Sequence, residues 1–287
     1  MRGINVQIAE ALARIRATRP LIHHLTNLVV MNDTANVTLH VGALPVMAHA
    51  AEEVAEMTAQ ADALLLNTGT LDLERVESML VAGRKANERG IPIVLDPVGA
   101  GATKLRTRVN LRLLSALQIA VVRGNGGEIG SLRGAGGAVK GVESVQGVRD
   151  PAAVARAAAS DWNTVVAITG EQDVASDGRR VLAVENGHRW LTTITGSGCM
   201  ATTMVAAFAA VEDDYLTATV GGLACFGLAS ERAADEAHGP ASFKVALFDH
   251  IYDLTPEQLE TGARIVALSP TRNSQRDPEK EDHVSSQ

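Results

Sequence analysis

The segment Ile91-Pro92-Ile93-Val94-Leu95-Asp96-Pro97-Val98-Gly99 is an apolar run that stops at an aspartate and a glycine-bearing turn. Helical patterns separate this run from three others of the same form. Apolar runs that alternate with helices in this way indicate parallel strands buried on both faces. The other three are Ala63–Leu66 before Asn67-Thr68-Gly69, Ile119–Val122 before Arg123-Gly124-Asn125, and Val165–Ile168 before Thr169-Gly170. The sequence therefore predicts an α/β fold with a mostly parallel central sheet flanked by helices.

Polar residues follow each of these four runs. In parallel α/β sheets the ligand site lies beyond the carboxyl ends of the strands. We therefore expect Asn67, Asp96, Arg123 and Thr169 to lie along one rim of the sheet. This expectation comes from position in the pattern and not from a motif.

The pattern changes after Thr169. Asp177-Gly178 and Asn186-Gly187 are typical of tight hairpin turns. They predict an antiparallel edge in which strands Arg180–Glu185 and His188–Ile194 flank the second turn, and the last strand leads into Gly196. Helical patterns account for most of the remaining chain. The expected helices are Cys199–Val211, Leu216–Ala237, Pro240–Leu254 and Pro256–Val266.

The two ends of the chain differ in character. Residues 5–17 carry apolar positions at helical spacing, and a second helix is expected after Asn32 or Asp33, either of which suits its cap. Residues 269–287 are polar and charged and lack periodicity, which is typical of a disordered tail. We found no internal linker of that composition, so the sequence predicts one domain over residues 1–268.

Composition limits the class of protein. The net charge of −7 argues against a surface for nucleic acid or acidic membrane. Two cysteines, Cys199 and Cys225, suggest neither a disulfide framework nor a metal-ligand pair, and this favours a reducing compartment. Neither a signal peptide nor an apolar run long enough for a membrane span is evident. We expect a soluble cytoplasmic protein.

The turn Thr195-Gly196-Ser197-Gly198-Cys199 stands before a small-residue apolar helix. The two glycines allow backbone N–H groups to turn inward, and the first turn of the helix adds unpaired donors and the positive end of its dipole. Such a turn suits a phosphate or a developing anion. The same field would favour the thiolate of Cys199. The alternative is that the glycines serve packing geometry alone.

Nucleotide-binding signatures give a negative result. Gly196, Gly198 and Ala201 satisfy the spacing of a dinucleotide fingerprint, but no second strand follows to carry the acidic residue that this site requires. The glycine-rich segment Gly124 to Gly141 has Ile129 and Val139 where the last glycine is needed. A P-loop sequence is absent. If the protein handles ATP, it does so with another architecture.

Asp96 and Glu128 are the acidic residues placed just beyond the central strands. Two carboxylates on that rim are sufficient for Mg²⁺, which usually keeps several waters. The alternatives are a turn cap for Asp96 and a favourable first-turn acid for Glu128. Arg123 suits phosphate oxygens, or else pairs with Glu128.

Three residues near the N-terminus have both structural and functional interpretations. Met47 is either core filler or part of an apolar pocket for a flat ring. His23 and His24 point to opposite faces of an extended segment, so adjacent metal ligation is disfavoured, and hydrogen-bonded or partly exposed histidines are expected.

Taken together, these motifs resemble the hydroxyethylthiazole kinase family, which has the ribokinase-like fold. The similarity covers about residues 5–267 and lacks only the tail. The matching segments are Thr26–Asn36, Pro45–Ala50 with Glu52-Glu53, Leu95–Gly99, Arg123-Gly124-Asn125 with Glu128, Ile168–Glu171 with Asp173, and Thr195–Cys199.

The resemblance implies phosphorylation of the hydroxyethyl group of 4-methyl-5-(2-hydroxyethyl)thiazole by MgATP in thiamine salvage. It also implies a homotrimer with active sites between subunits. Carried over by motif, the residues fall into four roles: thiazole binding by Met47, Asn27 and Gly196; ATP binding by Arg123, Thr169 and Asn125; Mg²⁺ and phosphate binding by Asp96 and Glu128; and catalysis by the turn Gly196, Ser197, Gly198 and Cys199. Many relatives in the wider ribokinase-like group have an aspartate base where this chain has Cys199, so the base remains open.

Three other functions remain open from the sequence. They are a kinase of the same fold acting on a pyrimidine alcohol, a nucleotide-dependent repair dehydratase of related fold, and a non-catalytic ligand-binding protein. The polar groups on the strand rim argue against the last.

Overall fold

The computed structural model describes residues 3–135 and 149–268. One nine-stranded sheet runs through this part of the chain in the order β2-β1-β3-β4-β5-β6-β7-β8-β9. The strands β1 to β6 are parallel, and β7, β8 and β9 are antiparallel to their neighbours. The expected mixed sheet with an antiparallel edge is therefore confirmed. The strands are β1 Leu21–Leu25, β2 Leu44–Val46, β3 Ala63–Asn67, β4 Ile93–Asp96, β5 Val121–Asn125, β6 Val165–Thr169, β7 Asp173–Ser176, β8 Val181–Val184 and β9 Ile265–Ala267.

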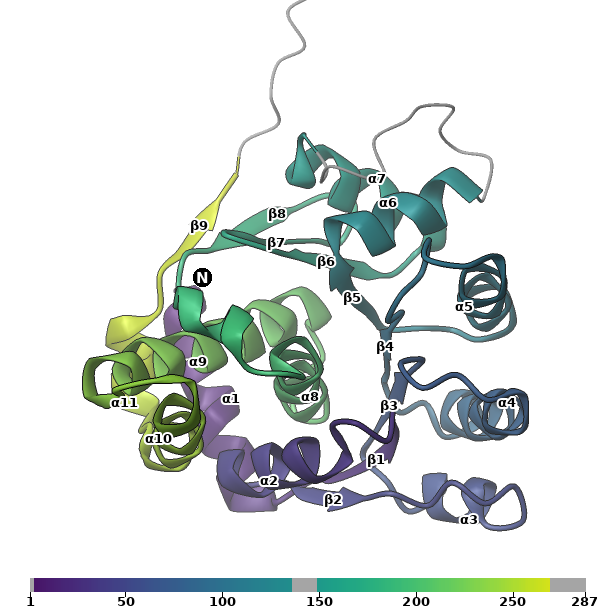
Figure 1. Cartoon of the computed structure of the whole chain (residues 1–287), viewed down its shortest axis with the longest axis horizontal. Coiled ribbons are helices and arrows are strands. Elements are labelled where there is room, and N and C mark those ends of the chain that lie inside the picture. Colours follow the sequence, from purple (N-terminus) through teal and green to yellow (C-terminus); the bar gives the residue numbers. More distant parts are fainter. Residues whose placement is uncertain (1–2, 136–148, 269–287) are drawn as a thin grey trace, which may run out of the picture.

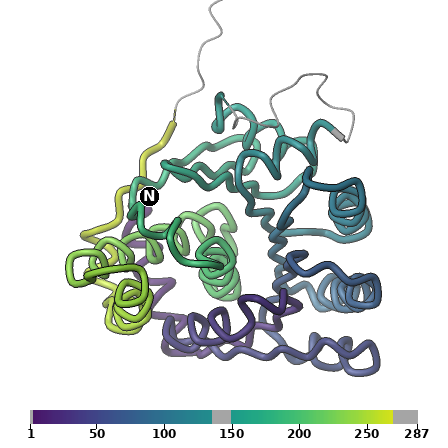
Figure 2. Tube along the Cα trace, viewed as in Figure 1, coloured from purple at the N-terminus to yellow at the C-terminus, as the bar shows by residue number. Residues whose placement is uncertain are grey.

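Helices cover both faces of the sheet (Figure 1). Figure 2 shows the same three layers in the course of the backbone. One face carries α1 Ile4–Thr18, α2 Met31–Val41, α8 Ser197–Ala209, α9 Tyr215–Glu236, α10 Pro240–Asp253 and α11 Pro256–Gly262. The other carries α3 Val54–Thr58, α4 Leu73–Arg89, α5 Lys104–Ala116, α6 Gly126–Ala135 and α7 Pro151–Trp162.

Two hydrophobic cores, one on each face, explain the continuous apolar runs. Strand β3 is buried along its whole length, with alternate residues in the two cores: Leu65 packs with the α8 and α9 side, and Leu64 with the α4 side. A strand covered on both faces needs apolar residues at every position. Helix α8 is buried nearly all round from Met200 onward, which fits its uniformly small and apolar sequence.

Local signals fix most helix boundaries. The side chains of Asp72, Thr103 and Asp150 accept hydrogen bonds from first-turn amides of α4, α5 and α7. Gly90 ends α4 in the left-handed region (φ 70°). The second helix differs from expectation: it begins at Met31 with neither Asn32 nor Asp33 as a cap. Asp33 instead pairs with Lys244 on α10.

Of the two hairpin turns predicted for the antiparallel edge, the structure confirms the first and not the second. The Asp177-Gly178 turn does join β7 to β8, but the predicted strand His188–Ile194 is wrong. Residues Arg189–Thr193 form a 3₁₀ helix, η1, in which the hydroxyls of Thr192 and Thr193 donate to carbonyls three residues back.

Strand β9 pairs with β8 in the position expected for the strand His188–Ile194. Helix α11 ends at Gly262, short of the predicted end at Val266, and the chain then pairs with β8. Asn186 is committed to this junction, because its side chain donates to the Gly262 carbonyl and accepts from the Arg264 amide. It does not form the expected second hairpin. The predicted tail, residues 269–287, lies outside the described residues, and the single domain over 1–268 stays a prediction.

Candidate active site

Polar side chains gather at the carboxyl ends of the parallel strands, as the sequence predicts. Asn67 of β3 lies opposite Asp96 of β4, and Asn125 of β5 lies opposite Thr169 of β6. The start of α8 reaches the same rim, since α8 packs against β3 and β4. The rim is thus formed from segments about 170 residues apart in the sequence.

Asp96 is the buried centre of this rim, with 1% of its surface exposed. Its Oδ2 accepts from Asn67 Nδ2 (2.9 Å) and from Thr202 Oγ1 (2.9 Å) on α8. Burial raises the pKa of Asp96 to about 6, which the charge of Arg123 opposes and that of Glu128 reinforces. A buried carboxylate held by neutral donors, with a second carboxylate near, favours a cation at this position.

Cys199 lies in the first turn of α8 beside two amide side chains. Asn67 Nδ2 lies 3.1 Å and Asn27 Nδ2 lies 3.6 Å from its sulfur, and Asn27 Nδ2 also donates to Asn67 Oδ1 (2.9 Å). The expected thiolate is wrong. Burial, and secondly the charge of Asp96, raise the pKa of Cys199 to about 12, and they outweigh the opposing effects of Asn67, Arg123 and Asn27. At neutral pH Cys199 is a thiol.

The turn before α8 keeps its donors free. Gly196 adopts φ 84°, in the left-handed region that favours glycine, and its carbonyl accepts the first helical hydrogen bond from Met200. Within residues 3–135 and 149–268, the amides of Ser197, Gly198 and Cys199 donate no hydrogen bond to the protein. These residues are only partly buried. The anion pocket predicted from the sequence requires unused, accessible amides of this kind.

Arg123 crosses from β5 toward this turn. Its guanidinium donates to Thr169 Oγ1, and a Cβ placed on Gly198 would lie 2.8 Å from Nη1. Its Nε is buried without a partner in the described part of the chain. Asp173 lies near enough that the Arg123 charge lowers its pKa, although burial dominates and raises that pKa to about 6. Arg123 therefore has unused capacity for an anion beside the α8 turn.

Glu128 and Asn125 form a reciprocal pair at the start of α6. Glu128 Oε2 accepts from the Asn125 amide (2.9 Å), and Asn125 Oδ1 accepts from the Glu128 amide (2.9 Å). Glu128 Oε1 accepts from the Gly99 amide (2.8 Å). The alternative Arg123–Glu128 ion pair is not formed among the described residues.

The donor set fits a magnesium ion that keeps most of its other ligands from water and phosphate. The described residues contain no group of three His, Cys, Asp or Glu side chains arranged to hold a metal. Asp96 and Glu128 are close enough to interact, and the hydrogen bonds that Asp96 accepts from Asn67 and Thr202 both go to Oδ2. One or two carboxylates are the usual protein share of a Mg²⁺ site that serves phosphate chemistry.

Met47 follows the edge strand β2, and the two histidines lie on its neighbour β1. Met47, half-buried, follows β2, and its carbonyl accepts from His49 Nδ1 (2.9 Å). His23 contacts Thr58 Oγ1 and the Ala48 carbonyl. His24 contacts Thr38 Oγ1, and its Nδ1 has no partner in the described part of the chain. Both histidines are buried, and burial lowers their pKa, that of His24 to about 3.

Three residues at this rim make contacts that the sequence did not predict. Asn67 was expected on the rim but given no role, although it bonds to Asp96, Cys199 and Asn27. Thr202 stands one helical turn after Gly198, a spacing that places it on the same face of α8. His49 lies within the matching segment Pro45–Ala50, but the sequence assigned it no role.

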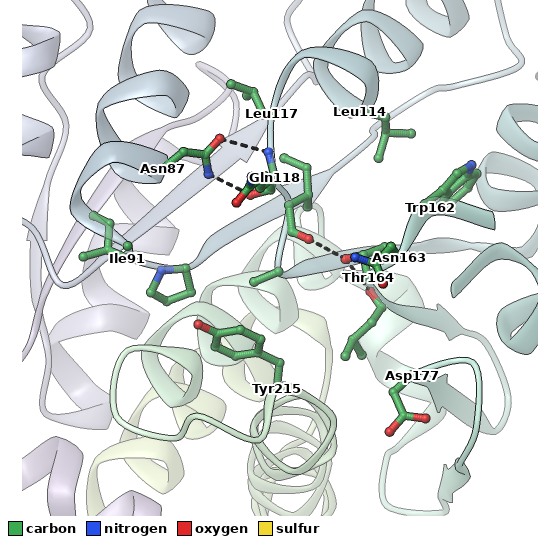
Figure 3. Close-up of a pocket in the computed structure, with 15 residues that line it drawn as sticks. Asn87, Ile91, Leu114, Leu117, Gln118, Trp162, Asn163, Thr164, Asp177 and Tyr215 are labelled. Atoms are coloured by element: carbon green, nitrogen blue, oxygen red, sulfur yellow. Dashed lines mark hydrogen bonds between the residues drawn. The ribbon is translucent and has the colours of Figure 1, made fainter. Parts of the chain in front are cut away.

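A separate recess lies at the amino ends of the strands, at the end of the sheet opposite the rim (Figure 3). Its volume is about 650 Å³, and its walls include Asn87, Trp162 and Tyr215 at the amino ends of β4 to β6. Figure 3 shows Asn87 bonded to the Gln118 backbone in both directions. The amide of Asn87 thus serves the fold, and none of the rim residues lines this recess.

The sheet order and the helical layers on both faces place the chain in the ribokinase-like fold class. A ribokinase-like superfamily protein from Enterococcus faecalis V583 superimposes with a TM-score of 0.57 at 13% identity, covering 88% of this chain and 84% of that one. At that identity the likeness shows the fold alone.

The sequence comparisons narrow the class. The profile of the hydroxyethylthiazole kinase family matches residues 12–257. Hydroxyethylthiazole kinase of Roseiflexus sp. (strain RS-1) is 72% identical over 266 residues, which is 93% of this chain and 98% of the relative. The structure of the hydroxyethylthiazole kinase protein from Pyrococcus horikoshii OT3 is 48% identical, with a TM-score of 0.85 over 92% of this chain and 99% of that chain. The chain belongs to the hydroxyethylthiazole kinase family.

Proposed function

We propose that the protein transfers the γ-phosphoryl group of ATP, with Mg²⁺, to the hydroxyl of 4-methyl-5-(2-hydroxyethyl)thiazole in thiamine salvage. Family membership supports the thiazole alcohol as acceptor. The observation that carries the mechanism is the α8 turn, whose amides at Ser197, Gly198 and Cys199 are unused within the described residues and lie beside Arg123 and Asp96. The pyrimidine-alcohol kinase, the dehydratase and the binding protein are not retained.

Each part of the rim has a role in this proposal. The transferred group passes through a loose transition state, so catalysis depends on positioning and on charge neutralisation. The α8 amides face the oxygens on which charge develops, and Arg123, Thr169 and Asn125 contact ATP. Asp96 and Glu128 would hold Mg²⁺, which offsets the charge of the nucleotide phosphates. The alcohol oxygen forms a bond to the γ-phosphorus as the bond from that phosphorus to the β-phosphate oxygen breaks. The electron pair of the broken bond stays on ADP, and the alcohol proton passes to solvent water.

The direct test is phosphate transfer. We expect the thiazole phosphate and ADP in equal amounts from the thiazole alcohol, ATP and Mg²⁺, with no product when Mg²⁺ is chelated. A pyrimidine alcohol is the control acceptor. Faster turnover on that control, or ADP without a phosphorylated product, would contradict the proposal.

The proposed thiazole site includes Met47, Asn27 and Gly196. Asn27 is 5% exposed and is held by Asn67, and its Oδ1 accepts from the amides of Val29 and Val30. Val30 in turn lies against Gly196, where a Cβ would come within 2.3 Å of Val30 Cγ1. The side chain of Asn27 therefore fixes the turn that closes against Gly196.

Cys199→Ala is expected to keep measurable turnover, with kcat lowered about tenfold or less. The thiol is protonated at neutral pH because its pKa is about 12, and a loose transition state makes little demand on a base. Cys199→Asp, which would accept from Asn67 and Asn27, is expected to match or exceed the wild type. Steady-state kinetics on both variants test this, and complete loss of activity in folded Cys199→Ala would show that the thiol is essential.

We also propose a homotrimer with active sites between subunits. Large apolar side chains are exposed next to the proposed thiazole site: Leu28 (64%), Val29 (63%) and Leu73 (61%). Leu28 follows Asn27, and its amide donates to Thr70, three residues before Leu73. Large apolar side chains exposed beside a site favour a subunit contact. Light scattering is expected to give three times the chain mass of 30.1 kDa, and a monomer would contradict the proposal.

The cellular location is proposed to be the cytoplasm. Among the described helices, none combines the length and hydropathy that a membrane crossing requires. The two cysteines are free thiols, as a reducing compartment would keep them.

A further inference from the structure

His49 joins the segment after β2 to the end of β1 by two hydrogen bonds. Its Nδ1 lies 2.9 Å from the Met47 carbonyl oxygen, and its Nε2 lies 3.2 Å from the Thr26 amide nitrogen. A carbonyl can only accept and an amide N–H can only donate. The ring is therefore neutral, with its proton on Nδ1, and the unprotonated Nε2 accepts the hydrogen bond from Thr26.

The two backbone groups that His49 joins adjoin the proposed thiazole site. Thr26 is fully buried and directly precedes Asn27. Its carbonyl accepts from Arg75 Nη1 (3.1 Å), so His49 and Arg75 between them hold both backbone polar groups of Thr26. On the other side, the Ala48 carbonyl accepts from His23 Nε2 (2.8 Å), which holds the residue between Met47 and His49.

We propose that His49 is a positioning residue that sets the spacing between Met47 and Asn27 and does so only in its neutral form. The inference rests on the proposed thiazole contacts of those two residues. Its consequence is that affinity for the thiazole alcohol, rather than the rate of phosphoryl transfer, depends on His49.

Protonation of His49 would disrupt this arrangement. A proton on Nε2 would face the Thr26 N–H, leaving two donors opposed and no acceptor. Two charged groups act on the ring in opposite directions: Arg75 on α4 lowers the His49 pKa, and the weaker effect of Glu53 raises it. His23 and His24 on β1 also face the ring, and a charge on His49 would lower their pKa values.

The direction of the pH effect follows from the His49 pKa. The pKa of His49 is lowered from 6.5, and burial is the largest cause of this shift. The neutral form, and with it the His49 link, is therefore present at pH 7 and is lost as the pH falls through the lowered pKa. Binding of the thiazole alcohol should weaken in acid.

The test is the Kd of the thiazole alcohol, measured by calorimetry without nucleotide between pH 5 and pH 8. His49→Gln retains an oxygen able to accept from Thr26 but does not titrate, and His49→Asn retains the donor to Met47 but does not reach Thr26. His40→Gln is the matched control, because His40 on α2 also has a pKa lowered by burial but packs on Phe248, away from the site.

We expect the wild type and His40→Gln to lose affinity in parallel at low pH. Both His49 variants should bind about three- to tenfold more weakly at pH 8, the effect of one hydrogen bond, and should lose most of the pH dependence, with kcat little changed. If the His49 variants keep wild-type Kd and the wild-type pH profile, the inference is wrong. If the wild type itself shows no binding at any pH and no phosphate transfer, the proposed function fails first.

Discussion

Asp96→Asn is expected to lower kcat by about a thousandfold while leaving the protein folded. Asparagine can still accept from Asn67 and Thr202, which hold the Asp96 side chain, but it lacks the charge that would bind a cation. A bound metal ion contributes several kcal/mol of charge stabilisation, and about 1.4 kcal/mol is tenfold in rate. Steady-state kinetics at saturating ATP and Mg²⁺ measure the effect.

The stability of Asp96→Asn separates a catalytic loss from a folding defect. The folded-state pKa of Asp96 is about 6, above its ordinary 3.8, so this group favours the folded state below its ordinary pKa and that contribution is lost as the pH rises through 6. A neutral asparagine avoids the cost of ionisation, and the Tm of the variant at pH 8 should equal or exceed that of the wild type. Asp235→Asn, at an exposed position on α9, is the charge control. Activity of Asp96→Asn within tenfold of that control would contradict the assigned role.

The strands that carry the site could be predicted because their signals are local. Leu64, Leu65 and Leu66 are three consecutive buried residues. An unbroken apolar run of this kind indicates a central strand, and it can be identified without knowledge of the adjacent strands. Asn67 and Asp96 end their strands at the same level because parallel register brings carboxyl ends together. The position of the rim residues therefore follows from where each parallel strand ends in the sequence.

The edge of the sheet could not be predicted because it depends on a partner far along the chain. Arg189–Thr193 has residues typical of a strand, yet β8 takes β9 as its neighbour from residues 265–267. Asn186-Gly187 has the composition of a hairpin turn, but the Asn186 side chain bonds to the backbone of Gly262 and Arg264. Local preference gives way here to a non-local contact.

The state of Cys199 could not be predicted for a different reason. The helix N-terminus that the sequence reveals favours a thiolate, but burial and Asp96, which the sequence does not place beside it, raise its pKa. Asn67 acquires its role in the same way, since the Asn67 contacts with Asn27 and Cys199 join β3 to segments before and after it. Both results depend on three-dimensional neighbours.

Gly198→Ala is expected to lower kcat/KM for ATP about a hundredfold without loss of stability. An alanine Cβ would lie 2.8 Å from Arg123 Nη1, so the guanidinium has to move. The Arg123 guanidinium is the far end of a flexible side chain, and alanine is about 1 kcal/mol better than glycine within a helix, so the Tm should be unchanged or higher. Loss of a single group that stabilises developing charge costs about a hundred- to a thousandfold.

Comparison with two other glycines isolates the α8 turn as the cause. Gly196→Ala would also lose activity, but φ 84° and a clash with Val30 Cγ1 at 2.3 Å predict a lower Tm, so its kinetics alone are ambiguous. Gly239→Ala is the matched control, because Gly239 is extended and a Cβ there meets nothing within 4 Å. Gly198→Ala with kinetics like those of Gly239→Ala would show that neither the free amides of α8 nor the place of Arg123 beside them serves the transferred phosphoryl group.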